Sequence, residues 1–132
     1  MTPCFCTNLR LATRRLSAAY DAALEPFGIN IGQYFLLRSI AERQQISLTE
    51  LGQVTELERS TVGRNVRVLE RMGLVATGRG EADQREALVA LTAEGLARLT
   101  DAQPIWEETQ KDFAARLGAE NINALNAVLE AI

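Results

Sequence analysis

The chain has 132 residues, of which 47% are hydrophobic, enough for one globular domain with a single core. It contains no histidine, which excludes His-dependent hydrolytic triads, HExxH zinc sites and histidine general bases, so we expect no enzyme and no cofactor. No apolar run approaches the roughly 20 residues that span a bilayer, and no signal-peptide pattern is present, so we expect a soluble, cytoplasmic protein without a membrane partner. The net charge of −3 argues only weakly against nucleic acid, because phosphates respond to the local placement of charge.

The first 30 residues predict a long amphipathic helix. Thr2 followed by Pro3 resembles an N-cap with proline at the first helical position. Apolar residues then recur at three- and four-residue steps, at Phe5, Leu9, Ala12, Leu16, Tyr20, Ala23 and Phe27. A second helix, densely apolar and therefore central, follows from about Ile31, and Thr49 is placed to cap a short third helix.

The segment "ERSTVGRNVRVLERMGLV", residues 58–75, predicts a helix with a basic outer face. At 100° per residue, its apolar residues form one stripe and its arginines fall on the opposite side. The stripe consists of Val62, Val66, Leu69 and Met72, and the opposite side of Ser60, Arg64, Arg67 and Arg71. Two helices joined by a short turn, the second with basic residues outward, match the helix-turn-helix arrangement that enters the DNA major groove. Charges opposite an apolar stripe are more often only solvated, so this face alone does not establish DNA binding.

A β-hairpin is predicted after Gly73, which ends this helix. Residues 74–77 and 87–91 are short, apolar and partly β-branched, and the charged stretch between them contains two glycines. Such a hairpin can serve as a wing that reaches phosphates or the minor groove. Asp83 and Arg85 lie two residues apart, so in an extended segment the carboxylate could direct the guanidinium. The alternative is a solubilising turn with a weak surface ion pair.

The helix and the hairpin together resemble the MarR family of winged-helix bacterial transcription regulators. Residues 58–75 are similar to the recognition helix of that family, and "ADQREALVALTAEG", residues 82–95, to its wing signature of Asp, any residue, Arg and an apolar strand ending in Leu-Thr. The resemblance covers nearly the whole chain. It implies one mainly α domain with a small β-hairpin wing (α+β), in which about 31–92 form a winged helix-turn-helix lobe and about 1–30 and 93–132 form a dimerisation lobe.

The resemblance also implies a function and partners. A homodimer would bind a near-palindromic operator in double-stranded DNA, as a repressor released by a small ligand or by thiol oxidation. The implied DNA-binding residues are Ser60, Thr61, Arg64, Asn65, Arg67, Arg79, Asp83 and Arg85. A protein-interaction module on the same fold is the competing hypothesis, and the exposed arginines argue against it.

The C-terminal third predicts two further helices. Thr92 is placed to cap a long helix that is kinked at Pro104 and closed by Gly118, and a last amphipathic helix runs to Ile132. The candidates for lining an effector cavity between the two lobes are Tyr20, Tyr34 and Trp106. Aromatic residues at helical spacing are more often part of a core.

Cys4 and Cys6 are candidates for redox sensing, because the unpaired N–H groups of a first helical turn favour a thiolate. On a helix their side chains point about 200° apart, so a disulfide within one subunit requires that turn to unwind, and a bridge between subunits is easier. Two subunits could also pool four thiolates around zinc. The alternatives are two small packing residues, or a thiol enzyme, which would lack the usual two-residue spacing and an activating histidine.

Overall fold

The computed structural model describes residues 3–79 and 86–132. In chain order its elements are α1 (Phe5–Leu24), the 3₁₀ helix η1 (Glu25–Phe27), α2 (Ile31–Ala41), β1 (Gln45–Ser47), α3 (Leu48–Thr55), α4 (Arg59–Arg71), β2 (Val75–Arg79), β3 (Ala87–Leu91) and α5 (Ala93–Ala131). The predicted fold class is confirmed: the chain is mainly helical, with a small antiparallel sheet that includes the predicted hairpin.

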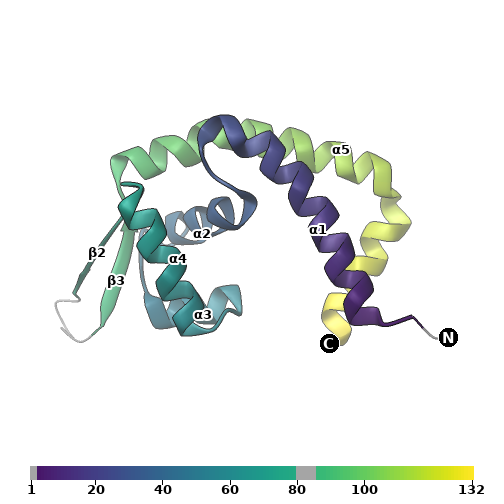
Figure 1. Cartoon of the computed structure of the whole chain (residues 1–132), viewed down its shortest axis with the longest axis horizontal. Helices are drawn as coiled ribbons and strands as arrows, with labels where there is room; N and C mark the ends of the chain where they lie inside the picture. Colours follow the sequence, from purple (N-terminus) through teal and green to yellow (C-terminus); the bar gives the residue numbers. More distant parts are fainter. Residues whose placement is uncertain (1–2, 80–85) are drawn as a thin grey trace.

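Helix α5 runs along one side of the molecule, as Figure 1 shows. The winged-helix part, residues 31–91, lies beneath the N-terminal end of α5, and α1 descends beneath the other half. Both chain ends therefore lie at the end of the molecule opposite the wing. Within residues 3–79 and 86–132, no helix is long and apolar enough to cross a membrane.

The hydrophobic core fills the winged-helix part. Helix α2 is central, as predicted, because Leu37 and Ile40 are fully buried there. Burial of one such side chain contributes about 1.5–3 kcal/mol to folding. The other large, fully buried side chains are Leu24, Ile46, Leu51, Val62, Val66, Leu69, Leu74 and Val89. They include most of the predicted stripe of α4, so that side of the helix faces inward and its basic side faces outward.

The sheet has three strands in the order β1-β3-β2, all antiparallel. Strand β3 is central, and its Val89 lies opposite Ile46 of β1 on one side and Thr77 of β2 on the other. Strand β3 begins and ends where the sequence predicts, whereas β2 extends to Arg79, two residues further than predicted. Strand β1 was not predicted.

Helix boundaries follow local capping. Ser47 caps α3 by accepting a hydrogen bond from the Glu50 N–H at 3.0 Å, so the predicted cap at Thr49 is wrong. Thr92 caps α5, as predicted, with the Gly95 N–H at 3.0 Å. Helical backbone angles continue through Pro104, and the break lies at Gly118, where φ is 80° and ψ is 159°.

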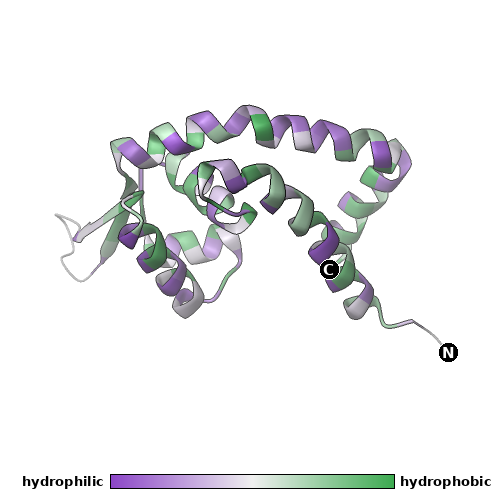
Figure 2. Ribbon diagram, turned by 45° about the horizontal axis from the view of Figure 1, so that its top comes forward, coloured by the Kyte–Doolittle hydropathy of each residue, from purple (hydrophilic) through white to green (hydrophobic). Residues whose placement is uncertain are grey.

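The N-terminal helix begins later than predicted. Helix α1 starts at Phe5, and Cys4 takes the N-cap position without a side-chain cap hydrogen bond. Much of the predicted apolar face of this helix is not covered by the chain itself, since Phe5 is 74% exposed and Leu9 is 44% exposed. Figure 2 shows hydrophobic positions along α1 and the C-terminal part of α5, outside the winged-helix core.

Candidate nucleic-acid interface

Helix α4 presents the predicted polar face to solvent. Ser60, Arg64, Asn65 and Arg67 are all exposed, whereas Thr61 is half-buried. The Thr61 hydroxyl accepts a hydrogen bond from the Arg64 guanidinium at 3.3 Å, which holds the end of that side chain close to the helix. Ser60, Arg64 and Arg67 thus share one accessible face, whereas Asn65 lies about 100° further around the helix from Arg64 and lines a separate groove against α2.

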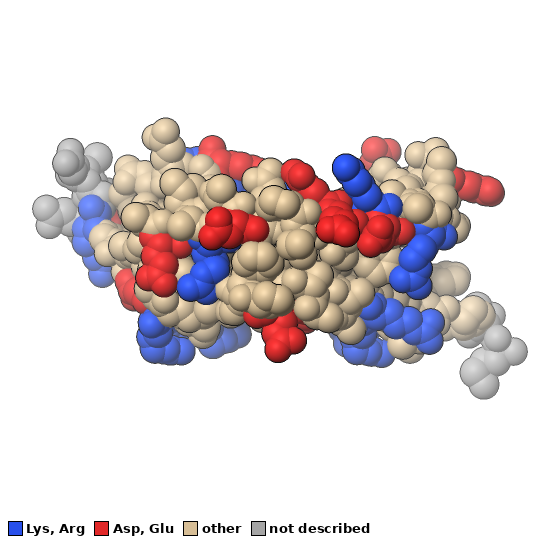
Figure 3. All heavy atoms as spheres, turned by 90° about the horizontal axis from the view of Figure 1, so that it is seen from above, with Lys and Arg blue, Asp and Glu red and all other residues tan. Residues whose placement is uncertain are grey.

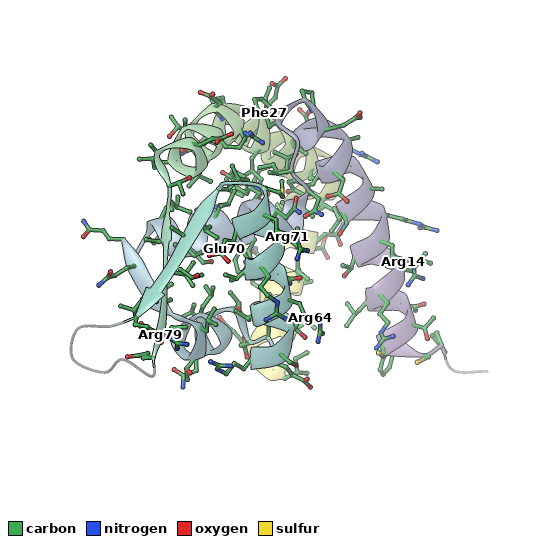
Figure 4. All side chains as sticks on the ribbon, turned by 60° about the vertical axis from the view of Figure 1, so that its left-hand side comes forward. Arg14, Phe27, Arg64, Glu70, Arg71 and Arg79 are labelled. Carbon is green, nitrogen blue, oxygen red and sulfur yellow. The ribbon has the colours of Figure 1, made fainter. Side chains whose placement is uncertain are left out.

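The arginines of this face are not neutralised by carboxylates. Among the residues that the structure describes, side-chain ion pairs involve Arg38, Arg43 and Arg98, and none involves the arginines of α4. Arg64 and Arg71 project from the side of α4 that is turned away from β2 (Figure 4). Apart from the one Arg64 donor that Thr61 accepts, the donors of these guanidiniums have no carboxylate partner and can bind an external acceptor such as a phosphate or a guanine edge.

A tight turn sets the angle between α3 and α4. Glu56 ends α3 with a left-handed backbone, φ 53°, and the Leu57 N–H donates to the Gly52 carbonyl at 3.1 Å. A Cβ at Gly52 would lie 3.1 Å from the Leu57 oxygen, tighter than ordinary contact. Sequence reasoning missed Gly52, because its role depends on this close approach and not on a helical pattern.

The wing is formed by β2 and β3. Arg79, the last described residue of β2, is exposed and lies opposite Ala87 (Figure 4). The structure therefore places Arg79 on the wing, as predicted. Asp83 and Arg85 lie outside the described residues, so their predicted pairing stays a prediction.

One junction ties the end of α4, the wing and α5 together. The Thr92 hydroxyl donates to the Gly73 carbonyl at 2.7 Å while it caps α5. The Thr92 N–H donates to the Leu74 carbonyl at 3.1 Å. Gly95 lies so close to that carbonyl that an added Cβ would stand 1.9 Å from the Leu74 oxygen. The sequence predicts the cap at Thr92, but it does not reveal the contacts with residues about 20 positions away.

Helices α4 and α5 carry net charges of opposite sign. Helix α4 has four arginines and one glutamate, whereas α5 has seven acidic and three basic residues. Figure 3, which looks down on α5, shows acidic side chains across the middle of this face and basic side chains along one long edge of the molecule. A chain with a net charge of −3 can thus still offer a locally positive surface to an anionic polymer.

Both cysteines are free and exposed at the start of α1. Hydrogen bonding to Thr7, first through its side chain and then through its backbone amide, lowers the pKa of the Cys4 thiol, and the Cys6 amide adds a smaller effect in the same direction. The structure places Cys4 before the first turn and Cys6 within it, which corrects the predicted position of Cys4.

The predicted aromatic cluster is split between two places. Tyr34 stacks on Trp106 with ring centres 5.6 Å apart, and the Arg38 guanidinium lies 4.7 Å above the Trp106 ring. These three residues border a groove of about 280 Å³ between α2 and α5. Tyr20 stacks on Phe113 at 5.5 Å and is not among the residues that line this groove, so its place in an effector cavity stays a prediction.

Known proteins are similar to this chain in sequence and in fold. A sequence model described as MarR family matches residues 27–86. The chain is 34% identical over 88 residues to the transcriptional regulator HosA of Escherichia coli, in an alignment covering 67% of the chain and 65% of HosA. It is 27% identical over 90 residues to the organic hydroperoxide resistance transcriptional regulator of Bacillus subtilis, covering 68% of the chain and 61% of that protein. The aligned part thus spans less than two thirds of either relative.

A solved structure extends the likeness to the terminal helices. The transcriptional regulator MOSR of M. tuberculosis, in complex with DNA, is similar over 98% of both chains, with a TM-score of 0.83 and 36% identity. All three proteins are named as transcriptional regulators. The family match over the winged helix and the full-length likeness agree, and the chain belongs to the MarR family.

Proposed function

We propose that this chain is a sequence-specific regulator that binds a near-palindromic operator in double-stranded DNA as a homodimer, acting in the cytoplasm as a repressor. The observation that carries the proposal is the exposed face of α4, on which Arg64 and Arg67 lie beside Ser60 without carboxylate partners among the described residues. The likeness to MOSR, which was solved in complex with DNA, supports it.

In this proposal α4 contacts base edges in the major groove, and the wing contacts the DNA backbone. Arginine binds the O6 and N7 atoms of guanine in the major groove with two parallel hydrogen bonds, and asparagine can bind adenine in a similar way. Arg64, Arg67 and Asn65 have the right chemistry for these contacts. Arg79, Asp83 and Arg85 would act on the wing, where a cation near phosphates adds affinity that depends on salt and little on sequence.

The homodimer is supported by apolar surface that one chain leaves uncovered. Phe5, Leu9, Val128 and Ile132 line a groove of about 460 Å³ where the start of α1 meets the end of α5. Leu129 beside it is 64% exposed. Exposed apolar surface of this kind marks protein interfaces, and a second copy would bring the same helices to cover it.

A pair of matched variants tests the dimer. Leu129→Asp places a charge in the proposed interface, so it should convert the protein to a monomer in sedimentation analysis and weaken operator binding. Leu96→Asp changes an equally exposed leucine, 54% accessible, near the other end of α5 and should leave the dimer intact. If Leu129→Asp remains fully dimeric, the dimer interface does not include this surface.

Release by thiol oxidation is supported by the environment of Cys4. A hydroperoxide would transfer one oxygen atom to the Cys4 thiolate, which leaves a sulfenic acid and releases water or an alcohol. The exposed position and the lowered pKa of Cys4 favour this reaction. The name of the Bacillus subtilis relative points to the same class of oxidant. Cumene hydroperoxide should therefore lower operator affinity, and dithiothreitol should restore it.

The cysteine variants decide between the two modes of release. If Cys4 is the sensor, Cys4→Ser should make operator binding insensitive to hydroperoxide. An unchanged oxidant response in the Cys4→Ser, Cys6→Ser double variant would exclude both thiols as the sensor. A small ligand would then be the favoured signal, and the groove bordered by Tyr34, Arg38 and Trp106 is the candidate site for it.

The decisive experiment is selection of bound sequences from random duplex DNA, because it tests DNA binding, symmetry and half-site spacing together. The enriched operator then serves to compare variants. Arg64→Ala and Arg67→Ala should each weaken operator binding by about 5- to 150-fold, the worth of a good bidentate contact. Lys111→Ala removes the same charge from α5 and should have little effect. Selection that enriches no sequence would favour the protein-interaction module.

A further inference from the structure

One carboxylate lies within the basic recognition helix. Glu70 stands next to Arg71 in a helix that otherwise carries four arginines as its charged residues. A negative charge close to DNA phosphates weakens binding, so its position needs a compensating reason. Figure 4 shows Glu70 on the side of α4 that faces β2, whereas Arg64 and Arg71 lie toward the other side.

The Glu70 carboxylate holds the edge of the wing. Strand β2 is an edge strand, so alternate backbone N–H groups point away from β3 and have no strand partner. One of them, the Thr77 N–H, donates to Glu70 Oε2 at 3.2 Å. The Thr77 hydroxyl donates to the same oxygen at 2.5 Å. The helix thus supplies to β2 the acceptor that a further strand would otherwise supply.

Other contacts hold only the base of the wing. The Leu74 N–H donates to the Leu69 carbonyl at 3.0 Å, and Val75 is almost fully buried. Beyond Val75 the side chains of β2 are exposed, so burial no longer fixes the strand. Along this outer half, the ladder with β3 and the bonds to Glu70 set the direction of β2. Arg79 follows Thr77 by two residues and shares its face of the strand, about 7 Å further on.

We propose that Glu70 is a positioning residue, which fixes the direction of the wing relative to the recognition helix and so places the wing cations against the DNA backbone. This inference rests on the proposed DNA-binding function. The carboxylate does not touch DNA. Its two hydrogen bonds to Thr77 hold the strand that carries Arg79 in place against the DNA backbone. The attraction between Arg79 and the phosphates offsets the repulsion between Glu70 and the phosphates.

Two substitutions at Glu70 separate positioning from charge. Glu70→Gln removes the charge but keeps an oxygen that can accept both bonds from Thr77, so its affinity for the selected operator should equal the wild-type value or exceed it by about threefold at most. Glu70→Ala removes the charge and both bonds, and should bind roughly 5- to 20-fold more weakly, with a salt slope smaller by about 1. A bystander carboxylate predicts tighter binding for both variants, which would overturn the proposal.

Thr77→Val tests the same link from the strand. This change keeps the shape, the charge of Glu70 and the backbone bond, and loses the hydroxyl bond. We expect a folded protein with operator affinity reduced by about two- to fivefold. Wild-type affinity and salt slope in Thr77→Val would contradict the inference even if Glu70→Ala unfolds. As a control, Glu58 at the N-cap of α4 makes no side-chain cap bond, so Glu58→Ala and Glu58→Gln should behave alike.

A coupling measurement connects Glu70 to the wing. If Glu70 acts by aiming Arg79, then Arg79→Ala should weaken binding in the wild-type background and have much less effect in the Glu70→Ala background. Equal effects in both backgrounds would refute the aiming role. Failure of the proposed function looks different, because the wild-type protein would then select no operator.

Discussion

Replacement of Gly95 by alanine should damage the junction between α5 and the wing more than any change of its size elsewhere in the helices. An added Cβ would lie 1.9 Å from the Leu74 oxygen and 2.9 Å from the Leu74 carbonyl carbon. A carbon and a carbonyl oxygen normally approach to about 3.3 Å, so the two backbones must separate by about 1.4 Å. Neither atom belongs to a flexible side chain, so no rotamer change can relieve the overlap.

The expected loss of stability follows from what that separation breaks. Leu74 is fully buried, and its carbonyl accepts the Thr92 N–H at 3.1 Å. Overpacking costs about 1–3 kcal/mol, and a lost backbone hydrogen bond costs about 1 kcal/mol more. The higher helix propensity of alanine adds at most about 1 kcal/mol to the free energy of unfolding. We therefore expect Gly95→Ala to lower the free energy of unfolding by about 1–3 kcal/mol, or the Tm by about 4–12 °C for a chain of this size.

Thermal unfolding followed by circular dichroism at fixed protein concentration measures this loss. The matched control is Gly63→Ala, because Gly63 is also a buried helical glycine but its added Cβ would meet only the Arg67 guanidinium at 3.7 Å. That variant should be unchanged or up to about 1 kcal/mol more stable. If Gly95→Ala unfolds within 2 °C of the wild type, roughly the error of such a comparison, the close approach of the two backbones is not what holds this junction.

Three further outcomes are expected. Thr92→Val removes the cap of α5 and the bond to the Gly73 carbonyl, so it should cost about 1–2 kcal/mol in thermal unfolding. In the Cys6→Ser variant, the rate of Cys4 alkylation by iodoacetamide should rise with pH around a midpoint below that of an unperturbed cysteine thiol, because the lowered pKa extends the thiolate to lower pH. Arg85→Ala should weaken operator binding and flatten its salt dependence. Asp83→Ala should do part of the same damage if the carboxylate aims Arg85, and should tighten binding if it is a bystander.

The elements predicted correctly are those with long, regular patterns. The apolar stripe of α4 repeats over nearly three turns, so both the existence of the helix and its buried side can be predicted from the sequence. Strand β3 is an apolar run of 5 residues that follows the glycine turn signals and ends before the Thr92 cap, and it is too short for a helix. Strand β1 has three residues, too few for any alternation, and it forms because Ile46 can be buried opposite Val89.

The N-cap of α3 also depends on contacts that are not visible in the local sequence. Ser47 and Thr49 are both good N-cap residues, and local preference does not choose between them. Pairing of β1 with β3 extends the chain up to Ser47, so the helix starts directly after it. In the candidate site, too, some residues can be predicted from the sequence and others cannot. The arginines of α4 are visible as a pattern, whereas Gly52, Glu70 and Gly95 act through contacts that only the folded chain creates.

These contacts also constrain how a signal could reach the DNA-binding surface. The Arg98 guanidinium on α5 donates to the Phe27 carbonyl at 2.7 Å, and the Asp21 carboxylate at the end of α1 accepts the Ile31 N–H at 2.8 Å. Together with the Thr92 junction, they fix the winged-helix part to the near ends of both terminal helices. The break in α5 at Gly118 lies beyond these contacts, toward the exposed apolar groove. A signal at the start of α1 would therefore move each winged-helix part as one rigid unit, and would change operator affinity by changing the separation of the two units in the proposed dimer.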